Sequence, residues 1–142
     1  MSLNLDTARS IVAGVREHAA AAGFKPMTVV VLDAGGHVVA AEREDGSSMS
    51  RFEIGYGKAY GALALGMGSR SIMGRAEQQP FFIAAVTSAV GGSLVPVPGG
   101  VLVRDSEGVL LGAVGVTGDT SDNDESAAVA GIEGAGLTAQ TD

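Results

Sequence analysis

The first clear hydrophobic pattern lies between residues 5 and 22, where apolar side chains recur every three or four positions. This spacing places them on one side of a helix and predicts an amphipathic helix over that range. Asn4 or Asp6 can cap its start, and Gly23 can end it. The same kind of spacing predicts three more helices. Their ranges are 51–67, a short segment within 68–79, and 122–137.

Short runs rich in β-branched residues predict strands. Residues 27–32 and 37–42 flank a Gly-containing turn, which is typical of a β-hairpin. Residues 101–104 and 109–116 flank a second turn of this kind. Three segments have no regular pattern: 81–92 is ambiguous, 95–98 is extended because it holds two prolines, and the tail 138–142 is expected to be loose.

The order of elements is helix, hairpin, helices, hairpin, helix, which predicts an α+β fold. Strands joined by tight turns pair antiparallel, and helices at both ends and in the middle of the chain must cover the faces of the sheet. No linker or change of composition divides the 142 residues. We therefore expect one domain over residues 1–142.

Charge and composition exclude several functional classes. The net charge is −7 and the sequence has no cluster of Lys and Arg, which disfavours binding to nucleic acid or to an anionic membrane. The absence of cysteine excludes disulfides, thiolate chemistry and Cys-ligated zinc. The N-terminus lacks a basic, apolar leader, and prolines interrupt the uncharged stretch 78–103. We therefore expect no signal peptide, no membrane span and a cytoplasmic location.

The predicted helix over residues 51–67 is apolar on both sides, and Lys58 is the only charge between Glu53 and Arg70. A helix that is apolar all round is buried on both sides. In so small a domain, we expect another subunit or a ligand to cover the second side, with Gly57 and Gly61 allowing close approach. An unpaired buried ammonium is costly. Lys58 should therefore meet Asp124, Glu125, a carbonyl or an anionic ligand.

Three other features carry candidate chemistry. Gly99 and Gly100 can present backbone N–H groups to an anion, or they can simply turn the chain into a strand. Residues 119–125 are acidic but lack the calcium-loop spacing, and Asp122 fits a helix N-cap instead. His18 and His37 are the only histidines in the sequence. Each is either an ordinary surface residue or an axial ligand of haem iron.

Taken in order, these motifs resemble the GlcG/HbpS-type family. The resemblance rests on residues 31–40, Lys58-Ala59, 98–101, 112–118, and Asp124-Glu125 followed by Ala130-Gly131, which together span almost the whole chain. It implies a profilin-like α/β/α fold around an antiparallel sheet of about five strands, with helices layered on the sheet. It also implies homo-oligomers, often octamers. Some relatives bind haem, which makes haem a candidate cofactor.

Three functions stay open on these residues. The first is a homo-oligomeric binding protein whose pocket, formed by Lys58, Gly99, Gly100, Asp124 and Glu125, takes haem or another anionic small molecule. The second is an enzyme acting on small hydroxy or carboxylic acids, with Lys58 and Asp124 or Glu125 as acid–base groups. The third is a scaffold without a ligand of its own. The first is favoured, because the sequence has no nucleophile elbow, phosphate loop or dinucleotide fingerprint.

Overall fold

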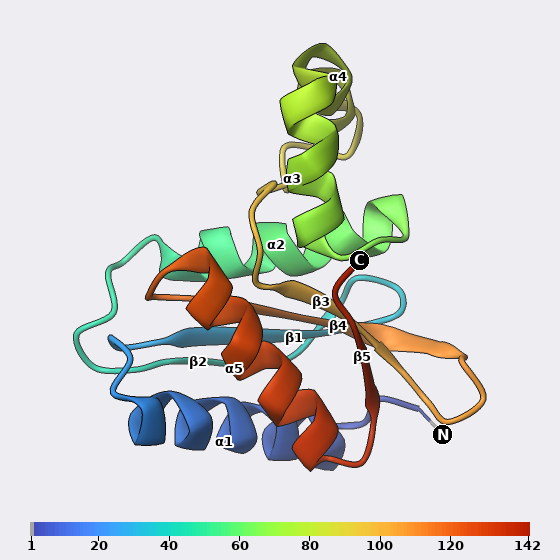
Figure 1. Cartoon of the computed structure of the whole chain (residues 1–142). Helices are drawn as coiled ribbons and strands as arrows, with labels where there is room; N and C mark the ends of the chain where they lie inside the picture. The colour runs from blue at the N-terminus through green and yellow to red at the C-terminus, as the bar shows by residue number, and fades with distance from the viewer. Residues whose placement is uncertain (1) are drawn as a thin grey trace.

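The computed structural model describes residues 2–142, which form five helices and a five-stranded sheet (Figure 1). The helices are α1 (Leu5–Ala22), α2 (Arg51–Leu65), α3 (Ser69–Gln78), α4 (Pro80–Ala89) and α5 (Ser121–Gly134). The strands are β1 (Thr28–Asp33), β2 (Val38–Arg43), β3 (Gly100–Arg104), β4 (Leu110–Thr117) and β5 (Thr138–Gln140).

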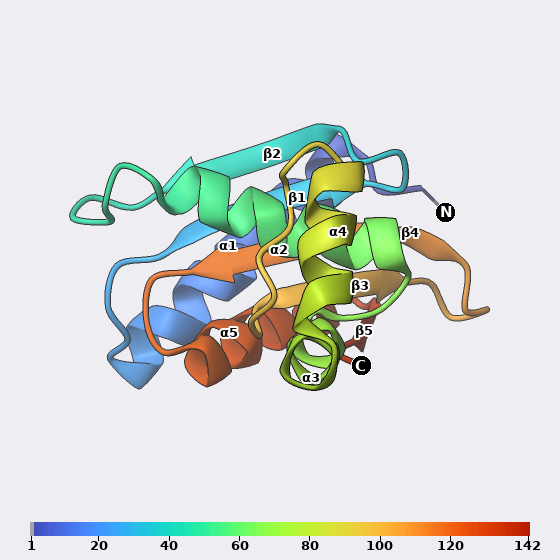
Figure 2. The same cartoon turned by 90° about the horizontal axis from the view of Figure 1, so that it is seen from above.

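The strands lie in the order β2-β1-β4-β3-β5, and every neighbouring pair is antiparallel. Helix α2 covers one face of the sheet, while α1 and α5 cover the other (Figures 1 and 2). The predicted α+β fold with α/β/α layers is therefore confirmed. Both predicted hairpins are present, as β1–β2 and β3–β4.

The central strands β1 and β4 are largely apolar because both faces of the sheet are covered. Along β1, Val29 and Val31 join the core beneath α1 and α5, whereas Val30 and Leu32 join the core beneath α2. Strand β3 alternates in the same way, with Leu102 beneath α2. The alternation of side chains along each strand thus divides one apolar run between two cores.

Helix α2 lies close to the sheet because small residues form its contact face. A Cβ at Gly115 would overlap the carbonyl of Gly55, so the helix backbone rests on strand β4. Ala59 and Ala62 follow along the same face and are fully buried. This close approach fixes the height of the whole helix above the sheet.

Part of the second side of α2 is covered by the protein's own chain. Leu94 and Val95 lie over Gly61 and Gly57, and the Val95 N–H donates to the Gly57 carbonyl at 3.2 Å. The predicted close approach at these two glycines is confirmed. Leu94 and Val95 thus fill the space over these two glycines, while burial of the rest of this side by another subunit or a ligand stays a prediction.

Helices α3 and α4 stand away from the layered body and run in different directions, with α4 turning away from the end of α3 (Figures 1 and 2). Their small core contains Ile72, Ile83 and Leu94 and is separate from the two cores of the sheet. At their base, the Gly68 N–H donates to the Asp142 carbonyl at 2.9 Å. We call α3, α4 and their connection the helical arm.

The observed ends of α1 match the predicted ones, whereas the observed N-cap of α5 differs from the predicted one. The Asn4 side chain caps α1, and Gly23 ends it with a left-handed φ of 73°. The cap of α5 is Thr120, whose side chain accepts the Asn123 N–H. The predicted Asp122 cap was therefore wrong: Asp122 lies within the first turn of α5.

Other boundaries also differ from the sequence expectations. The ambiguous segment forms α4, with Pro80 in its first turn, where a proline costs no hydrogen bond. The tail expected to be loose contains β5, which pairs with β3. Helix α2 ends at Leu65, two residues before the predicted end.

The observed cap leads to a stability prediction. Thr120→Val keeps the shape of the side chain but removes the acceptor, so it should lower the free energy of unfolding by about 1 kcal/mol. Asp122→Asn, the control, should cost less because that carboxylate is exposed. Urea denaturation compares the two variants. A larger loss for Asp122→Asn would contradict the assignment of Thr120 as the cap.

Candidate functional site

Lys58 and Asp124 are the two buried charges of the predicted ligand set. The Lys58 side chain is 2% exposed and projects from the middle of α2. The Nζ atom lies 3.1 Å from Oδ2 of Asp124, whose side chain is also 2% exposed, and it donates to the Val116 carbonyl at 2.9 Å. Of the two carboxylates expected beside Lys58, the structure thus places Asp124 there.

The environment of Lys58 perturbs its proton affinity. Burial lowers the pKa of the Lys58 ammonium, because desolvation penalises the charged form, and Asp124 opposes that effect. The nearby positive charge of Arg51 lowers this pKa further. A buried ion pair is costly to form, and removing one partner is costlier, because the other charge then stays buried and alone.

The loop before α5 holds Asp124 in position. Its second carboxylate oxygen, Oδ1, accepts the Asp119 N–H at 2.8 Å. The Asp119 carboxylate accepts hydrogen bonds from the Lys25 N–H, the Asn123 side chain and the Thr120 N–H, which lower the pKa of Asp119 to about 2. Both oxygens of Asp124 are therefore bound, one by the ammonium and one by the backbone.

Gly99 and Gly100 adjoin the same ion pair. A Cβ at Gly99 would lie 2.8 Å from Nζ of Lys58, and one at Gly100 would overlap the Lys58 carbonyl. The Gly100 N–H is not bare, since it donates to the buried Ser69 hydroxyl at 2.7 Å. The two glycines let β3 pass close to α2.

Glu125 faces away from the buried pair and binds Arg70 from the helical arm at 3.0 Å. Arg70 also bridges to Asp122 at 2.5 Å, so it connects α3 with α5. The structure thus gathers Lys58, Gly99, Gly100 and Asp124 in the interior and leaves Glu125 beside them in a partly exposed network.

The two histidines lie apart from each other and from the Lys58 pair. Nε2 of His18 is 3.2 Å from the Ser126 hydroxyl, and its ring stands edge-on to Phe24. His37 follows the β1–β2 turn, and its side chain is 79% exposed. Among residues 2–142, no group of three or more His, Asp and Glu side chains is arranged to hold a metal ion.

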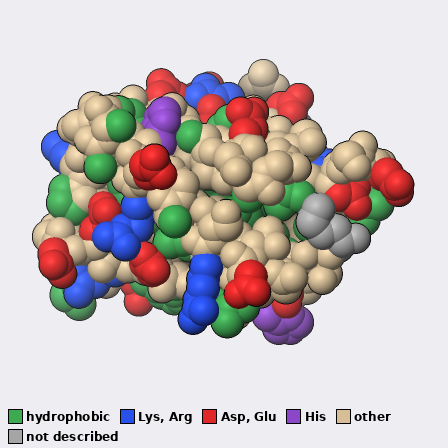
Figure 3. Space-filling model, turned by 90° about the horizontal axis from the view of Figure 1, so that it is seen from below, with side chains coloured by type: hydrophobic (Ala, Val, Ile, Leu, Met, Phe, Trp, Pro, Cys, Tyr) green, Lys and Arg blue, Asp and Glu red, His purple; other side chains and the backbone are tan. Residues whose placement is uncertain are grey.

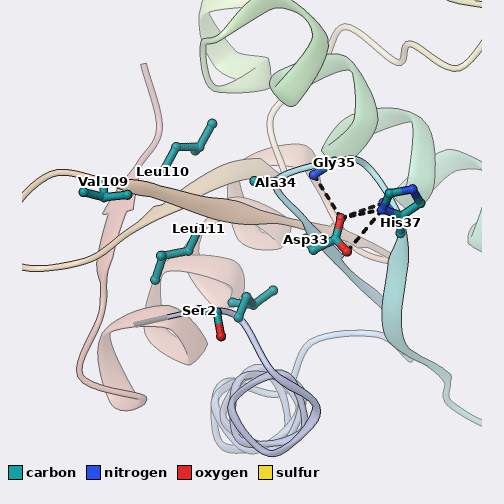
Figure 4. A pocket seen from close by; sticks show the side chains of 9 residues that line it. Ser2, Asp33, Ala34, Gly35, His37, Val109, Leu110 and Leu111 are labelled. Atoms are coloured by element: carbon teal, nitrogen blue, oxygen red, sulfur yellow. Dashed lines mark hydrogen bonds and ion pairs between the residues drawn. The ribbon is translucent and has the colours of Figure 1, made fainter.

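Asp33 holds the His37 ring in one orientation. Nδ1 of His37 lies 3.1 and 3.2 Å from the two carboxylate oxygens of Asp33 (Figure 4). The pKa of Asp33 is lowered, first by the hydrogen bond from the His37 backbone N–H. An ionised carboxylate only accepts hydrogen bonds, so Nδ1 is the donor in this contact, and Nε2 is the ring nitrogen that Asp33 does not contact.

An open cavity of about 540 Å³ lies beside this turn (Figure 4). The cavity is lined by the β1–β2 turn, by the start of strand β4 and by residues 2 and 3. The lining residues include Asp33, Gly35, His37, Val109, Leu111 and Leu3. Its size is typical of small-molecule pockets. We did not predict Asp33 from the sequence, although an acid four residues before a histidine across a tight turn was a usable signal.

The surface and the helices provide two further observations. On the face beneath the sheet, acidic and basic side chains are interspersed, and that face has no continuous basic patch (Figure 3). Within residues 2–142, no helix is both long enough and apolar enough to cross a bilayer.

Comparison with known proteins identifies the family. The model of a family described as haem degrading protein HbpS-like matches residues 3–133. The chain belongs to the HbpS-like family. The predicted resemblance is therefore confirmed. A comparison with curated protein sequences gave no match.

Solved structures share this HbpS-like fold. A PduOC–haem complex superimposes with a TM-score of 0.85 at 21% identity, covering 96% of this chain and 97% of that one. The Klebsiella pneumoniae protein ORFY gives 0.83 at 25% identity, covering 94% and 90%. A doubly substituted HbpS of Streptomyces reticuli gives 0.79 at 25% identity, covering 94% and 86%.

The buried pair makes Lys58 a critical residue for stability in this HbpS-like chain. Lys58→Met strands the Asp124 carboxylate and should lower the free energy of unfolding by about 3–5 kcal/mol. The double variant Lys58→Met/Asp124→Leu should recover part of that loss, since no charge then stays buried alone. Urea denaturation measures both.

Arg70→Met is the matched control, because it removes a cation from a half-exposed ion pair. It should cost about 1 kcal/mol or less. Equal losses for Lys58→Met and Arg70→Met would show that burial does not set the importance of Lys58.

Proposed function

We propose that this protein binds haem at the cavity beside the β1–β2 turn, with His37 as an axial ligand of the iron. The observation that carries the proposal is the Asp33–His37 pair, in which Asp33 occupies Nδ1 of an exposed imidazole that lines a 540 Å³ cavity, so that Nε2 would be the ligating atom. Membership of the HbpS-like family, described as haem degrading, supports haem as the ligand, as does the fold shared with a PduOC–haem complex.

The arrangement around His37 resembles the usual support of a metal-binding histidine. Such a histidine donates its second ring N–H to a carboxylate or carbonyl, which fixes the ring and strengthens the ligand. Asp33 supplies that acceptor, and the Gly35 and His37 backbone N–H groups hold its carboxylate in turn. Val109 and Leu111 add apolar surface for a porphyrin.

No lysine or arginine is among the residues that line this cavity. Axial ligation and apolar contact would therefore dominate recognition there, with the propionates directed toward solvent. Ligand contact by Lys58, Gly99, Gly100, Asp124 and Glu125 stays a prediction. A ligand reaching Lys58 would have to replace its contacts with Asp124 and Val116. His18 likewise stays a candidate iron ligand.

The haem proposal predicts a Soret band when hemin is added, saturating at about one haem per subunit or fewer. His37→Ala should shift or abolish that band. Asp33→Asn should keep the spectrum but weaken affinity by about 10–100-fold, because the ring loses its charged acceptor. Titration followed by absorbance measures all three proteins.

His18→Ala is the control, since it removes the other histidine. It should leave the spectrum unchanged. If only His18→Ala changes the band, His18 is the ligand and the proposed cavity is wrong. If neither substitution changes it, histidine ligation is wrong for this protein.

We also propose that the protein forms a homo-oligomer through the helical arm. Helix α4 carries no charge, and Ile83 is its only buried residue. Phe81, which is 74% exposed, lies on the open side of the helix together with Ala84 and Ala85. A contiguous exposed apolar surface of this kind marks an interaction site. The octamer and the cytoplasmic location predicted from the sequence stay predictions.

Phe81→Glu should dissociate the assembly, because it would place an unpaired charge in the subunit contact. Light scattering at micromolar concentration measures the subunit number. Leu5→Glu is the control, since Leu5 is 45% exposed and lies on α1, on the other side of the sheet. A wild-type monomer, or a Phe81→Glu variant as large as wild type, would contradict the proposed interface.

A further inference from the structure

The end of the sheet opposite the His37 turn contains a second, smaller cavity of about 180 Å³. It is lined by the chain just before β1, by the loop that precedes α2 together with the first residue of α2, and by the chain that leaves β4. Its lining residues are Lys25, Pro26, Gly46, Ser47, Ser48, Arg51 and Gly118. The six residues of β1 separate the two cavities by about 17 Å, given the rise of a strand.

Two cations line this cavity, and no acid does. Among the described residues, neither Lys25 nor Arg51 forms an ion pair, whereas Arg16 and Arg70 each bind two carboxylates. Arg51 makes one hydrogen bond, from Nη1 to the Thr117 hydroxyl at 2.7 Å. Its guanidinium has five N–H donors in a fork that matches two oxygens of an anion. In a chain of net charge −7, an unpaired, half-buried arginine at a cavity is a distinctive feature.

The hydroxyls and the backbone around the cavity are ordered. The Ser47 side chain is buried and bonds the Thr28 hydroxyl at 2.8 Å, while its carbonyl accepts from Arg43. The Arg51 N–H donates to the Ser48 carbonyl at 3.1 Å, which fixes the loop against the start of α2. Ser50 gives that helix no side-chain cap. The cavity is thus framed by ordered hydroxyl and backbone groups beside the positive end of a helix.

We infer that this cavity binds a small oxoanion, a carboxylate or a phosphate, between Arg51 and Lys25. Its volume is about six times the space that one water molecule takes in the liquid, which suits an anion of four or five heavy atoms. A planar or tetrahedral oxoanion presents two oxygens to the arginine fork and a further oxygen to the lysine. The bound charge would also offset the repulsion between Arg51 and the buried Lys58. The site is independent of the proposed haem cavity.

The test uses inorganic phosphate, acetate and chloride with the full chain at constant ionic strength. Thermal unfolding and ¹H–¹⁵N spectra are recorded for each ion. We expect phosphate or acetate, but not chloride, to raise the melting temperature and to shift the amides of Ser47, Ser48 and Gly118. The ion with the larger effect identifies which oxoanion the site prefers.

Two substitutions locate the site. Arg51→Gln should weaken binding about tenfold or more, because it removes a charge-assisted hydrogen bond. Lys25→Gln, at an exposed position that tolerates substitution, should weaken it about threefold. Arg9→Gln is the control, since it removes one exposed positive charge from α1 and should leave affinity unchanged.

Three results would overturn the inference. Chloride could match both oxoanions, the shifted amides could lie elsewhere, or Lys25→Gln and Arg9→Gln could have equal effects. The Lys25 variant keeps the test decisive if Arg51→Gln fails to fold. Haem binding is not needed for any of these measurements, so failure here and failure of the haem proposal are distinguishable.

Discussion

The buried ion pair between Lys58 and Asp124 connects the two helical layers through the end of the sheet. Lys58 comes from the helix on one face and Asp124 from the first turn of the helix on the other, and the ammonium also donates to the Val116 carbonyl of β4. Both charges are satisfied only when all three elements are in place, because removing either partner leaves the other charge buried and alone. The position of α5 is thus tied chemically to that of α2.

That requirement accounts for several neighbouring residues. The ammonium can reach β4 only if α2 lies low on the sheet, which Gly55 and Gly115 permit. The adjoining strand must pass without side chains at Gly99 and Gly100. The loop before α5 must turn one oxygen of Asp124 toward Lys58 and the other toward the backbone. These glycines and hydrogen bonds therefore make the contact between Lys58 and Asp124 possible.

The sequence predicts the helices and strands of this protein better than the contacts between them. Helix α1 follows from its apolar stripe and its cap, and the two hairpins follow from their turns. The choice between Asp124 and Glu125 does not follow, because adjacent helix residues differ by 100° in direction and only the register of α5 decides which faces inward. The N-cap of α5 was misplaced for a similar reason, since Thr120 and Asp122 are both good capping residues.

Residues 91–97 have no regular spacing of apolar residues that could reveal their contact with α2. Neither cavity could be predicted, because each joins segments distant in the chain.

The separate core of the helical arm has a consequence for how the molecule opens. Its buried apolar side chains are Ile72 and Ile83, with Leu94 packed against them, so the arm contains far less buried apolar surface than the body. Its amides should exchange with solvent through local unfolding at a lower free energy than the global transition, while those of β1 and β4 follow global unfolding. Any partner that covers α4 would raise the free energy of that local opening by mass action. The rate of amide exchange in the helical arm therefore reports the fraction of molecules in which a partner covers α4.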